Sequence, residues 1–508
     1  MGIYQSLQNG SDIRGVALEG VAGQPVNLTP QAVRDIATGF VGWLTQKKAV
    51  TDPSQLRVSV GRDSRLSGPA LSATFCQALA EAGIAVSQFG LASTPAMFMS
   101  TVTPGYAYDA AVMITASHLP FNRNGLKFFT CDGGLEKGDI SSILERAAQG
   151  MAAPVAGGSI SEVDFMPVYA RQLADTIRQH VNAEDYAQPL TGFHIVVDAG
   201  NGAGGFYATQ VLKELGADIS GSQFLEPDGH FPNHIPNPED GAAICSLRQA
   251  VLANQADLGL IFDTDVDRGA AMDAEGKEIN RNRLIAMLAA ILLEESPGCG
   301  IVTDSITSSG LHDFITVRGG VHHRFKRGYK NVINEAQRLN AQGGHFLAAI
   351  ETSGHGALKE NYFLDDGAYL VTRLVIKMAQ LAKEGKSLPA LIADLVEPVE
   401  SVEFRMNIGH ADFAAYGQRV IEAIAQCADE QPGWQIAPDN HEGIRVSFGP
   451  HDGDGWFLLR LSLHDPLMPL NIESMQPGGS KRIAQAVLQA LAAFCELDTA
   501  SLQAYVAE

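Results

Sequence analysis

The chain has 508 residues, of which 45% are hydrophobic and 18% charged, and this composition excludes a collagen, a coiled coil and a largely disordered protein. Its formal net charge of −21 argues against a nucleic-acid partner or an anionic membrane surface, unless basic residues are gathered locally. At roughly 150 residues per domain, the length predicts three or four domains.

The cysteines and the apolar runs indicate where the protein works. Its six cysteines are scattered and form no C-x-x-C pair, as expected of a reducing compartment. The longest apolar run, Leu284 to Leu293, is half the length of a membrane span, and the first residues lack the pattern of a signal peptide. We therefore expect a cytoplasmic protein that does not bind a membrane.

Strands and helices alternate from the first hundred residues onward. We expect strands at 57–61, 84–89 and 109–115, with a helix over 68–82. This rhythm restarts at a strand over 192–198 and at another over 299–304, and it predicts sheets covered by helices. After Pro398 the pattern changes, and we expect strands at 401–405, 443–448 and 456–462 and a final helix over 481–494.

These elements predict an α/β protein with three similar α/β domains, built on mixed sheets, and a C-terminal α+β domain. We place linkers at Met151–Gly158 and near Glu295–Gly298. The expected domains are 1–153, 154–297, 298–398 and 399–508.

The first candidate for chemistry is the segment Thr115–Pro120, which follows a predicted strand. Ser117 therefore lies at the carboxyl end of the strand, where α/β sheets keep their ligands. A polar turn closed by Pro120 is the alternative. No G-x-S-x-G motif surrounds Ser117, so hydrolase chemistry is not favoured. Lys127 could place an ammonium group beside the serine.

The second candidate is Asp263, Asp265 and Asp267, which follow another predicted strand. Three carboxylates on a curled loop can bind one hard cation such as Mg²⁺, and without a cation they would repel one another. An EF-hand calcium loop is excluded because Arg268 and Ala274 occupy the places of its glycine and glutamate. An acidic, solvated turn is the alternative.

Two more segments carry polar side chains next to predicted strands. Glu351 and Ser353 can bind vicinal hydroxyl groups, and His355 can move a proton unless it is simply a packed histidine. Arg460 and Ser462, at the end of the strand that begins at Trp456, suit a phosphate.

Together and in this order, the segments resemble the α-D-phosphohexomutase family, the phosphoglucomutases and phosphomannomutases. The resemblance begins at Asp12–Gly15 and reaches Arg460–Ser462, with supporting motifs at Gly61–Arg65, Ser93–Pro95 and Arg327–Lys330. It implies four domains around a central cleft and an enzyme that interconverts hexose 6-phosphate and hexose 1-phosphate, with mannose and glucose favoured.

The resemblance also implies roles for individual residues. Ser117 would carry the phosphoryl group, and Asp263, Asp265 and Asp267 would hold one Mg²⁺ together with an oxygen of the phosphoserine. Arg14 and Lys127 resemble the residues around the transferring phosphate, with Lys127 as a candidate general acid/base, and we count His118 and His355 as further catalytic candidates. The substrate-binding candidates are Glu351, Ser353, Arg268, Tyr329, Lys330, Arg460, Ser462 and His464.

The implied reaction needs a hexose 1,6-bisphosphate as intermediate and activator, because both ends of the sugar must reach one phosphoserine. The expected partner is a phosphorylated hexose, and the protein is expected to be a monomer or a small homo-oligomer. A phosphoglucosamine mutase is the nearest enzymatic alternative. A weakly catalytic sugar-phosphate-binding protein is the alternative from another class.

The C-terminal part departs from the family pattern. Leu461-Ser462-Leu463-His464 differs from the usual phosphate loop, although His464 could donate to a phosphate, and Leu119 replaces an asparagine common in the serine loop. Further on, Pro477–Lys481 is either a second phosphate-binding nest or a turn in which Ser480 caps the final helix.

Overall fold

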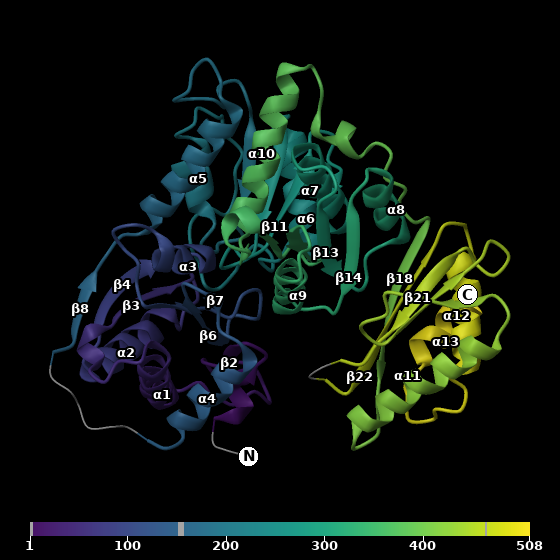
Figure 1. The fold of residues 1–508 in the computed structure, drawn as a ribbon, viewed down its shortest axis with the longest axis horizontal. Helices are drawn as coiled ribbons and strands as arrows, with labels where there is room; N and C mark the ends of the chain where they lie inside the picture. Colours follow the sequence, from purple (N-terminus) through teal and green to yellow (C-terminus); the bar gives the residue numbers. More distant parts are fainter. Residues whose placement is uncertain (1–3, 151–156, 463–464) are drawn as a thin grey trace. The chain divides into compact units, whose positions relative to one another are not determined.

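A computed structural model of the chain describes residues 4–150, 157–462 and 465–508, so most of the expected linker at 151–158 lies outside the described residues. The chain forms two compact units. Unit 1 comprises Met1–Leu288 and Ser353–Ala390, and unit 2 comprises Ala289–Thr352 and Leu391–Glu508. Figure 1 shows the elements of both units.

Unit 1 begins with a mixed sheet in which strands follow the order β1-β2-β6-β5-β3-β4-β8. β3 pairs in parallel with β4 and β5, whereas β6 runs antiparallel to β5 and β2. The strands are β1 (Gln8–Asn9), β2 (Asp12–Val16), β3 (Arg57–Arg62), β4 (Ala85–Leu91), β5 (Ala110–Ile114), β6 (Arg123–Thr130), β7 (Gly133–Gly134) and β8 (Ser159–Glu162).

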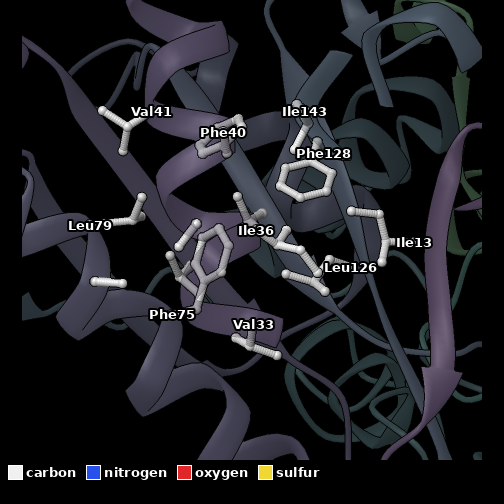
Figure 2. Close-up of a cluster of buried hydrophobic side chains, with 14 of the residues drawn as sticks. Ile13, Val33, Ile36, Phe40, Val41, Phe75, Leu79, Leu126, Phe128 and Ile143 are labelled. Atoms are coloured by element: carbon white, nitrogen blue, oxygen red, sulfur yellow. The ribbon is translucent and has the colours of Figure 1, made fainter. Parts of the chain in front are cut away.

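Helices cover this sheet, and an apolar core lies between the two layers. The helices are α1 (Pro30–Lys48), α2 (Gly68–Glu81), α3 (Thr94–Val102) and α4 (Lys137–Ala147), whereas the next helix, α5 (Met166–Val181), packs mainly against later elements of unit 1. Phe40 of α1, Phe75 of α2 and Phe128 of β6 meet in the core, where the rings of Phe40 and Phe128 are 5.0 Å apart (Figure 2). Burying rings of this size contributes about 1.5–3 kcal/mol each.

The second sheet of unit 1 has the order β12-β11-β10-β9. β10 pairs in parallel with β9 and antiparallel with β11, so this sheet is also mixed. Its elements are β9 (Ile195–Asp198), a π-helix (Tyr207–Leu212), α6 (Gly241–Asn254), β10 (Leu258–Phe262), β11 (Gly269–Asp273) and β12 (Glu278–Ile279). Helix α7 (Arg281–Glu295) follows, and its residues from Ala289 onward belong to unit 2. The later segment of unit 1 adds β16 (Gly356–Leu358), β17 (Leu364–Asp365) and α10 (Gly367–Lys383), which packs beside α5.

Unit 2 contains a parallel group of strands and an antiparallel sheet. β13 (Gly300–Asp304) pairs in parallel with β14 (Val321–Phe325) and β15 (Phe346–Ile350), alongside helices α8 (Ser309–Val317) and α9 (Tyr329–Ala341). The C-terminal sheet has the order β18-β22-β21-β20-β19 and is antiparallel throughout. Its elements are β18 (Glu400–Asn407), α11 (Phe413–Glu430), β19 (Trp434–Ile436), β20 (Ile444–Phe448), β21 (Gly455–Leu459), β22 (Leu467–Ser474), α12 (Gly479–Ala490) and α13 (Ala500–Ala507).

The α/β class, the mixed sheets and the separate C-terminal sheet are confirmed, but three details near the C-terminus were wrong. The strand expected over 456–462 ends at Leu459, so Arg460 and Ser462 follow it. Helix α12 ends at Ala490, and a further helix, α13, follows.

The third detail concerns Ser480, which does not cap α12, because Gly478 occupies the N-cap position. The Ser480 hydroxyl and N–H donate to Glu400, and the Gly478 N–H also donates to that carboxylate at 2.6 Å. A carboxylate of the protein therefore binds at this helix N-terminus.

In the part of the chain that the structure describes, no helix is both long enough and apolar enough to cross a bilayer. All six cysteines are free thiols.

Asp366, the N-cap residue of α10, gives a testable pH dependence of stability. It accepts from the Tyr169 hydroxyl at 2.7 Å and from the Tyr369 N–H at 2.9 Å, yet its burial raises its pKa from 3.8 to about 6. A carboxyl group whose pKa is raised in the folded state stabilises the fold at pH values below its unfolded-state pKa. This contribution is lost as the pH rises through its folded-state pKa.

We expect Asp366→Asn to abolish the fall in stability with rising pH that Asp366 causes. Between about pH 5 and pH 7.5, the free energy of unfolding of the wild type should fall by about 1.4 kcal/mol more than that of the variant, since one pKa unit corresponds to about that energy. Urea titrations at the two pH values measure the difference. The same pH dependence in both proteins would contradict the assignment.

Candidate active site

Ser117 follows strand β5 on a loop with an unusual backbone. Its φ of 53° lies in the left-handed region, which non-glycine residues adopt only when their surroundings hold them there. The Ser117 N–H donates to Thr115 Oγ1 at 2.9 Å, and the side chain is buried. Ser117 Oγ donates to Asp263 Oδ2 at 2.7 Å and lies 3.3 Å from His118 Nδ1. The serine hydroxyl therefore points at the acidic loop.

The acidic loop joins strand β10 to strand β11. A positive φ of 69° at Val266 turns the chain, and Asp263, Asp265 and Asp267 each place a carboxylate oxygen within 4.8 Å of the others. All three side chains are buried. Burial and the two neighbouring aspartates raise the pKa of Asp263 well above its ordinary value.

These three residues fit a divalent cation. Among the described residues, Asp265 Oδ1 and Asp267 Oδ1 are buried acceptors without a hydrogen-bond partner, which is costly in a folded protein unless a cation or water binds them. Carboxylate oxygens are the ligands that Mg²⁺ prefers. The loop can therefore hold a metal ion beside Ser117.

Basic residues from the first sheet surround the acidic loop. Lys127 of β6 donates to Asp265 Oδ2 at 2.8 Å and also pairs with Asp267. Burial alone would lower the pKa of Lys127, but the two carboxylates raise it well above its ordinary value, so this side chain is an ammonium group. Arg14 of β2 pairs with Asp12 at 2.9 Å. Positive charge is thus concentrated here in a protein that is otherwise acidic.

Arg268 and His355 form a second polar group within unit 1. Arg268 Nε donates to His355 Nε2 at 2.8 Å, and His355 Nδ1 lies 2.5 Å from Asp365 Oδ2. Burial lowers the pKa of His355, but Asp365 offsets this and the pKa is raised. In contrast, burial together with Arg268 and Arg14 lowers the pKa of His118 to about 2, so that imidazole is neutral at physiological pH.

A separate cluster of predicted residues lies in unit 2. Glu351 follows β15 and accepts from the Gly328 N–H at 2.6 Å, just before Tyr329 and Lys330 begin helix α9. Glu442 Oε2 accepts from Ser305 Oγ at 2.6 Å and from the Arg327 N–H at 3.2 Å.

Glu442 also connects this cluster to Arg460, whose Nη1 lies 4.0 Å from Glu442 Oε1. Burial and the charge of Arg327 lower the pKa of Arg460. The Arg460 guanidinium and the main-chain N–H of Arg327 are therefore both held near the Glu442 carboxylate.

The predicted site residues fall into two groups. Unit 1 brings together Ser117, His118, Arg14, Lys127, Asp263, Asp265, Asp267, Arg268 and His355. Ser353 also belongs to unit 1 and has a buried hydroxyl without a partner among the described residues. Glu351, Tyr329, Lys330, Arg460 and Ser462 belong to unit 2, and His464 lies outside the described residues. Their joint contact with one sugar phosphate stays a prediction.

Several residues of the sites were not predicted from sequence. Thr94 donates its hydroxyl to Asp265, Glu239 lies 3.7 Å from Arg268, and Asp365 holds His355. Asp365 is ten residues beyond its histidine, and no local pattern connects the two. Arg65 lies in the Gly61–Arg65 motif, but the motif does not reveal its contacts.

Comparison with known proteins gives the family. Three family models match the chain, namely the phosphoglucomutase/phosphomannomutase alpha/beta/alpha domain I at residues 5–153, domain II at 168–276 and domain III at 280–399. A phosphomannomutase/phosphoglucomutase of Pseudomonas syringae pv. tomato is 33% identical over 430 residues, which cover 84% of this chain and 85% of that protein. A phosphoglucomutase of Neisseria gonorrhoeae is 30% identical, over 89% of this chain and 92% of that protein.

A solved structure agrees with these relatives. The crystal structure of a phosphoglucomutase/phosphomannomutase family protein from Burkholderia thailandensis has a TM-score of 0.78 and 26% identity, and covers 96% of this chain and 97% of that chain. The sequence matches extend over both segments of unit 1 and include the serine and aspartate loops. The chain belongs to the phosphoglucomutase/phosphomannomutase family, the α-D-phosphohexomutases.

Proposed function

We propose that this isomerase interconverts hexose 6-phosphate and hexose 1-phosphate, with mannose and glucose as the sugars, and that Ser117 carries the phosphoryl group. The observation that supports this most is the 2.7 Å contact between Ser117 Oγ and Asp263 Oδ2, on a loop where two carboxylate oxygens have no hydrogen-bond partner in the part of the chain that the structure describes. The names of the Pseudomonas and Neisseria relatives support the choice of sugars. A cytoplasmic location and the division into four domains around a cleft belong to the same proposal.

In the proposed reaction, a sugar hydroxyl takes the phosphoryl group from Ser117. The bond between phosphorus and Ser117 Oγ breaks, a bond from phosphorus to the sugar oxygen forms, and the hydroxyl proton moves to a base. Ser117 Oγ leaves as an alkoxide that takes up a proton, for which the Lys127 ammonium group is the candidate acid. His355 is a candidate for that base, because Asp365 orients its ring. Lys127 and Arg14 bind the phosphoryl oxygens, since transfer depends mainly on positioning and charge neutralisation.

Asp263, Asp265 and Asp267, together with Ser117, would hold one Mg²⁺ per chain, which when bound would neutralise phosphoryl oxygens and polarise the bond to Ser117. The product of this transfer is a hexose 1,6-bisphosphate, which has to reorient in the site so that the phosphoryl group at its other end passes back to Ser117. Arg268, Glu351, Ser353, Tyr329, Lys330, Ser462 and His464 are proposed to bind the sugar and its second phosphate.

Arg460 is proposed to bind the phosphate that is not transferred. Arg460→Ala should raise KM by about one to two decades, because a charge-assisted hydrogen bond contributes roughly 1.5–3 kcal/mol. Steady-state kinetics against hexose 1-phosphate measure the change. Arg405→Ala is the matched control, since Arg405 is an exposed arginine of the same sheet that pairs with Glu403. An unchanged KM in Arg460→Ala would remove Arg460 from the phosphate site.

A coupled assay tests the proposed function as a whole. The purified chain is given Mg²⁺, a trace of hexose 1,6-bisphosphate and, in separate reactions, mannose, glucose or glucosamine 1-phosphate, and formation of the 6-phosphate is followed. We expect turnover with mannose or glucose phosphate that exceeds turnover with glucosamine phosphate. A preference for glucosamine phosphate would make the chain a phosphoglucosamine mutase. No turnover with any of the three would favour a sugar-phosphate-binding protein.

A further inference from the structure

Arg65 is a fully buried arginine whose guanidinium group contacts the main chain of the loop that carries Ser117. Its two terminal nitrogens donate to four main-chain carbonyls of that loop. Nη1 donates to Pro120 O at 2.8 Å and to Arg123 O at 3.1 Å, and Nη2 donates to Leu119 O at 2.6 Å and to Ser117 O. The planar guanidinium is the side chain that can bind several carbonyls in one fixed arrangement.

Asp63 connects Arg65 to the main-chain N–H of Ser117, by way of Thr115. Arg65 Nε lies 3.3 Å from Asp63 Oδ2, and Asp63 accepts from the Arg65 N–H at 2.9 Å. Asp63 also accepts from Thr115 Oγ1 at 2.6 Å, and Thr115 Oγ1 accepts from the Ser117 N–H at 2.9 Å. Both the N–H and the carbonyl of Ser117 are therefore tied to one buried ion pair, which follows strand β3.

A buried ion pair is an expensive way to stabilise a fold, because the desolvation of two charges can exceed their attraction. What the pair does here is specify geometry. Ser117 is held at a φ of 53°, and its Oγ is aimed at Asp263. Displacing a reacting group by about 1 Å can lower the rate of an oriented reaction about a hundredfold. A phosphoryl carrier has to keep one position through repeated transfers.

We propose that Arg65 is a positioning residue for phosphoryl transfer, which fixes the main chain of the serine loop so that Ser117 Oγ presents the phosphoryl group in one geometry. The inference rests on the proposed function of Ser117. None of the bonds described above joins Arg65 to the Ser117 hydroxyl or to the acidic loop. Arg65 therefore acts through the main chain of the serine loop.

Arg65→Lys tests the proposal in the full-length protein. Lysine keeps the charge but cannot span four carbonyls. We expect kcat to fall at least about tenfold with KM within about twofold of the wild type, because substrate binding is untouched and the transferring geometry is lost. Arg57→Lys is the matched control, since Arg57 is an exposed arginine of β3, the strand that precedes Arg65, and donates to Tyr106 O at 3.0 Å.

Hydrogen exchange of the amides at 117–123 gives a readout that does not depend on activity. We expect faster exchange in Arg65→Lys than in the wild type and in Arg57→Lys. Absence of mutase turnover in the wild type would defeat the proposed function, whereas the exchange experiment would still report on the loop. Wild-type kcat in Arg65→Lys, or unchanged exchange at 117–123, would overturn the positioning role.

A second variant serves if Arg65→Lys does not fold. Thr115→Val keeps the shape of the side chain and removes the bonds to the Ser117 N–H and to Asp63. The same split is expected, a lower kcat at a nearly unchanged KM, together with faster exchange of the loop. A Thr115→Val protein with wild-type kcat and wild-type exchange would also overturn the proposal.

Discussion

The Ser117→Ala variant is expected to lose mutase turnover by several orders of magnitude while its fold is retained. The variant lacks the atom that carries the phosphoryl group, and a loss of this kind cannot be compensated by substrate concentration. Alanine tolerates the left-handed φ of 53° about as poorly as serine does, so the backbone should not change greatly. The coupled assay, run with hexose 1-phosphate and hexose 1,6-bisphosphate, measures the loss.

The control for this variant is Ser87→Ala. Ser87 lies on strand β4 of the same sheet, and its hydroxyl bonds only weakly, at 3.4 Å, to that of Ser161. It should keep wild-type turnover. Near-normal turnover in a folded Ser117→Ala protein would show that the phosphoryl group is carried elsewhere.

The second large effect is expected in Asp265→Asn. The change removes one negative charge from the cluster of three carboxylates and weakens an oxygen that could bind a cation, Asp265 Oδ1. It also weakens the ion pair between Asp265 and Lys127, so the ammonium group loses one of the two carboxylates that hold it. Turnover should fall by orders of magnitude, and the Mg²⁺ concentration for half-maximal activity should rise.

A magnesium titration of activity separates these effects from general damage. Asp257→Asn is the matched control, because Asp257 accepts from the His194 N–H at 2.8 Å on an exposed part of the same sheet. Its magnesium dependence should equal that of the wild type. If Asp265→Asn also shows unchanged magnesium dependence, the metal does not bind at the three aspartates.

Much of the fold was predictable from the sequence, because the strands alternate with helices and are strongly apolar. Strand β3 and helix α2 lie within one or two residues of their predicted limits. The segment Pro477–Lys481, expected to be either a phosphate-binding nest or a turn, shows where such prediction stops. Glycines before a helix suit any anion, and only the three-dimensional structure reveals that Glu400, about 80 residues earlier, supplies it.

The candidate site was predictable to the same extent. Ser117 and the three aspartates were identified from their positions after strands, and the structure places Ser117 beside Asp263. Arg65, Thr94 and Asp365 could not be found in this way, because their roles depend on contacts made across the fold. A buried arginine that binds carbonyl groups has no sequence signature of its own, since its partners are main-chain atoms.

The measurement that tests the central claim most directly is the location of phosphate on the active protein. The protein is incubated with hexose 1,6-bisphosphate, its activity is verified, and its intact mass and peptides are analysed by mass spectrometry. We predict one phosphoryl group per chain, on the peptide that contains Ser117, and none on that peptide in Ser117→Ala. An active protein whose phosphoryl group lies on another residue, or which turns over without acquiring one, would contradict the account.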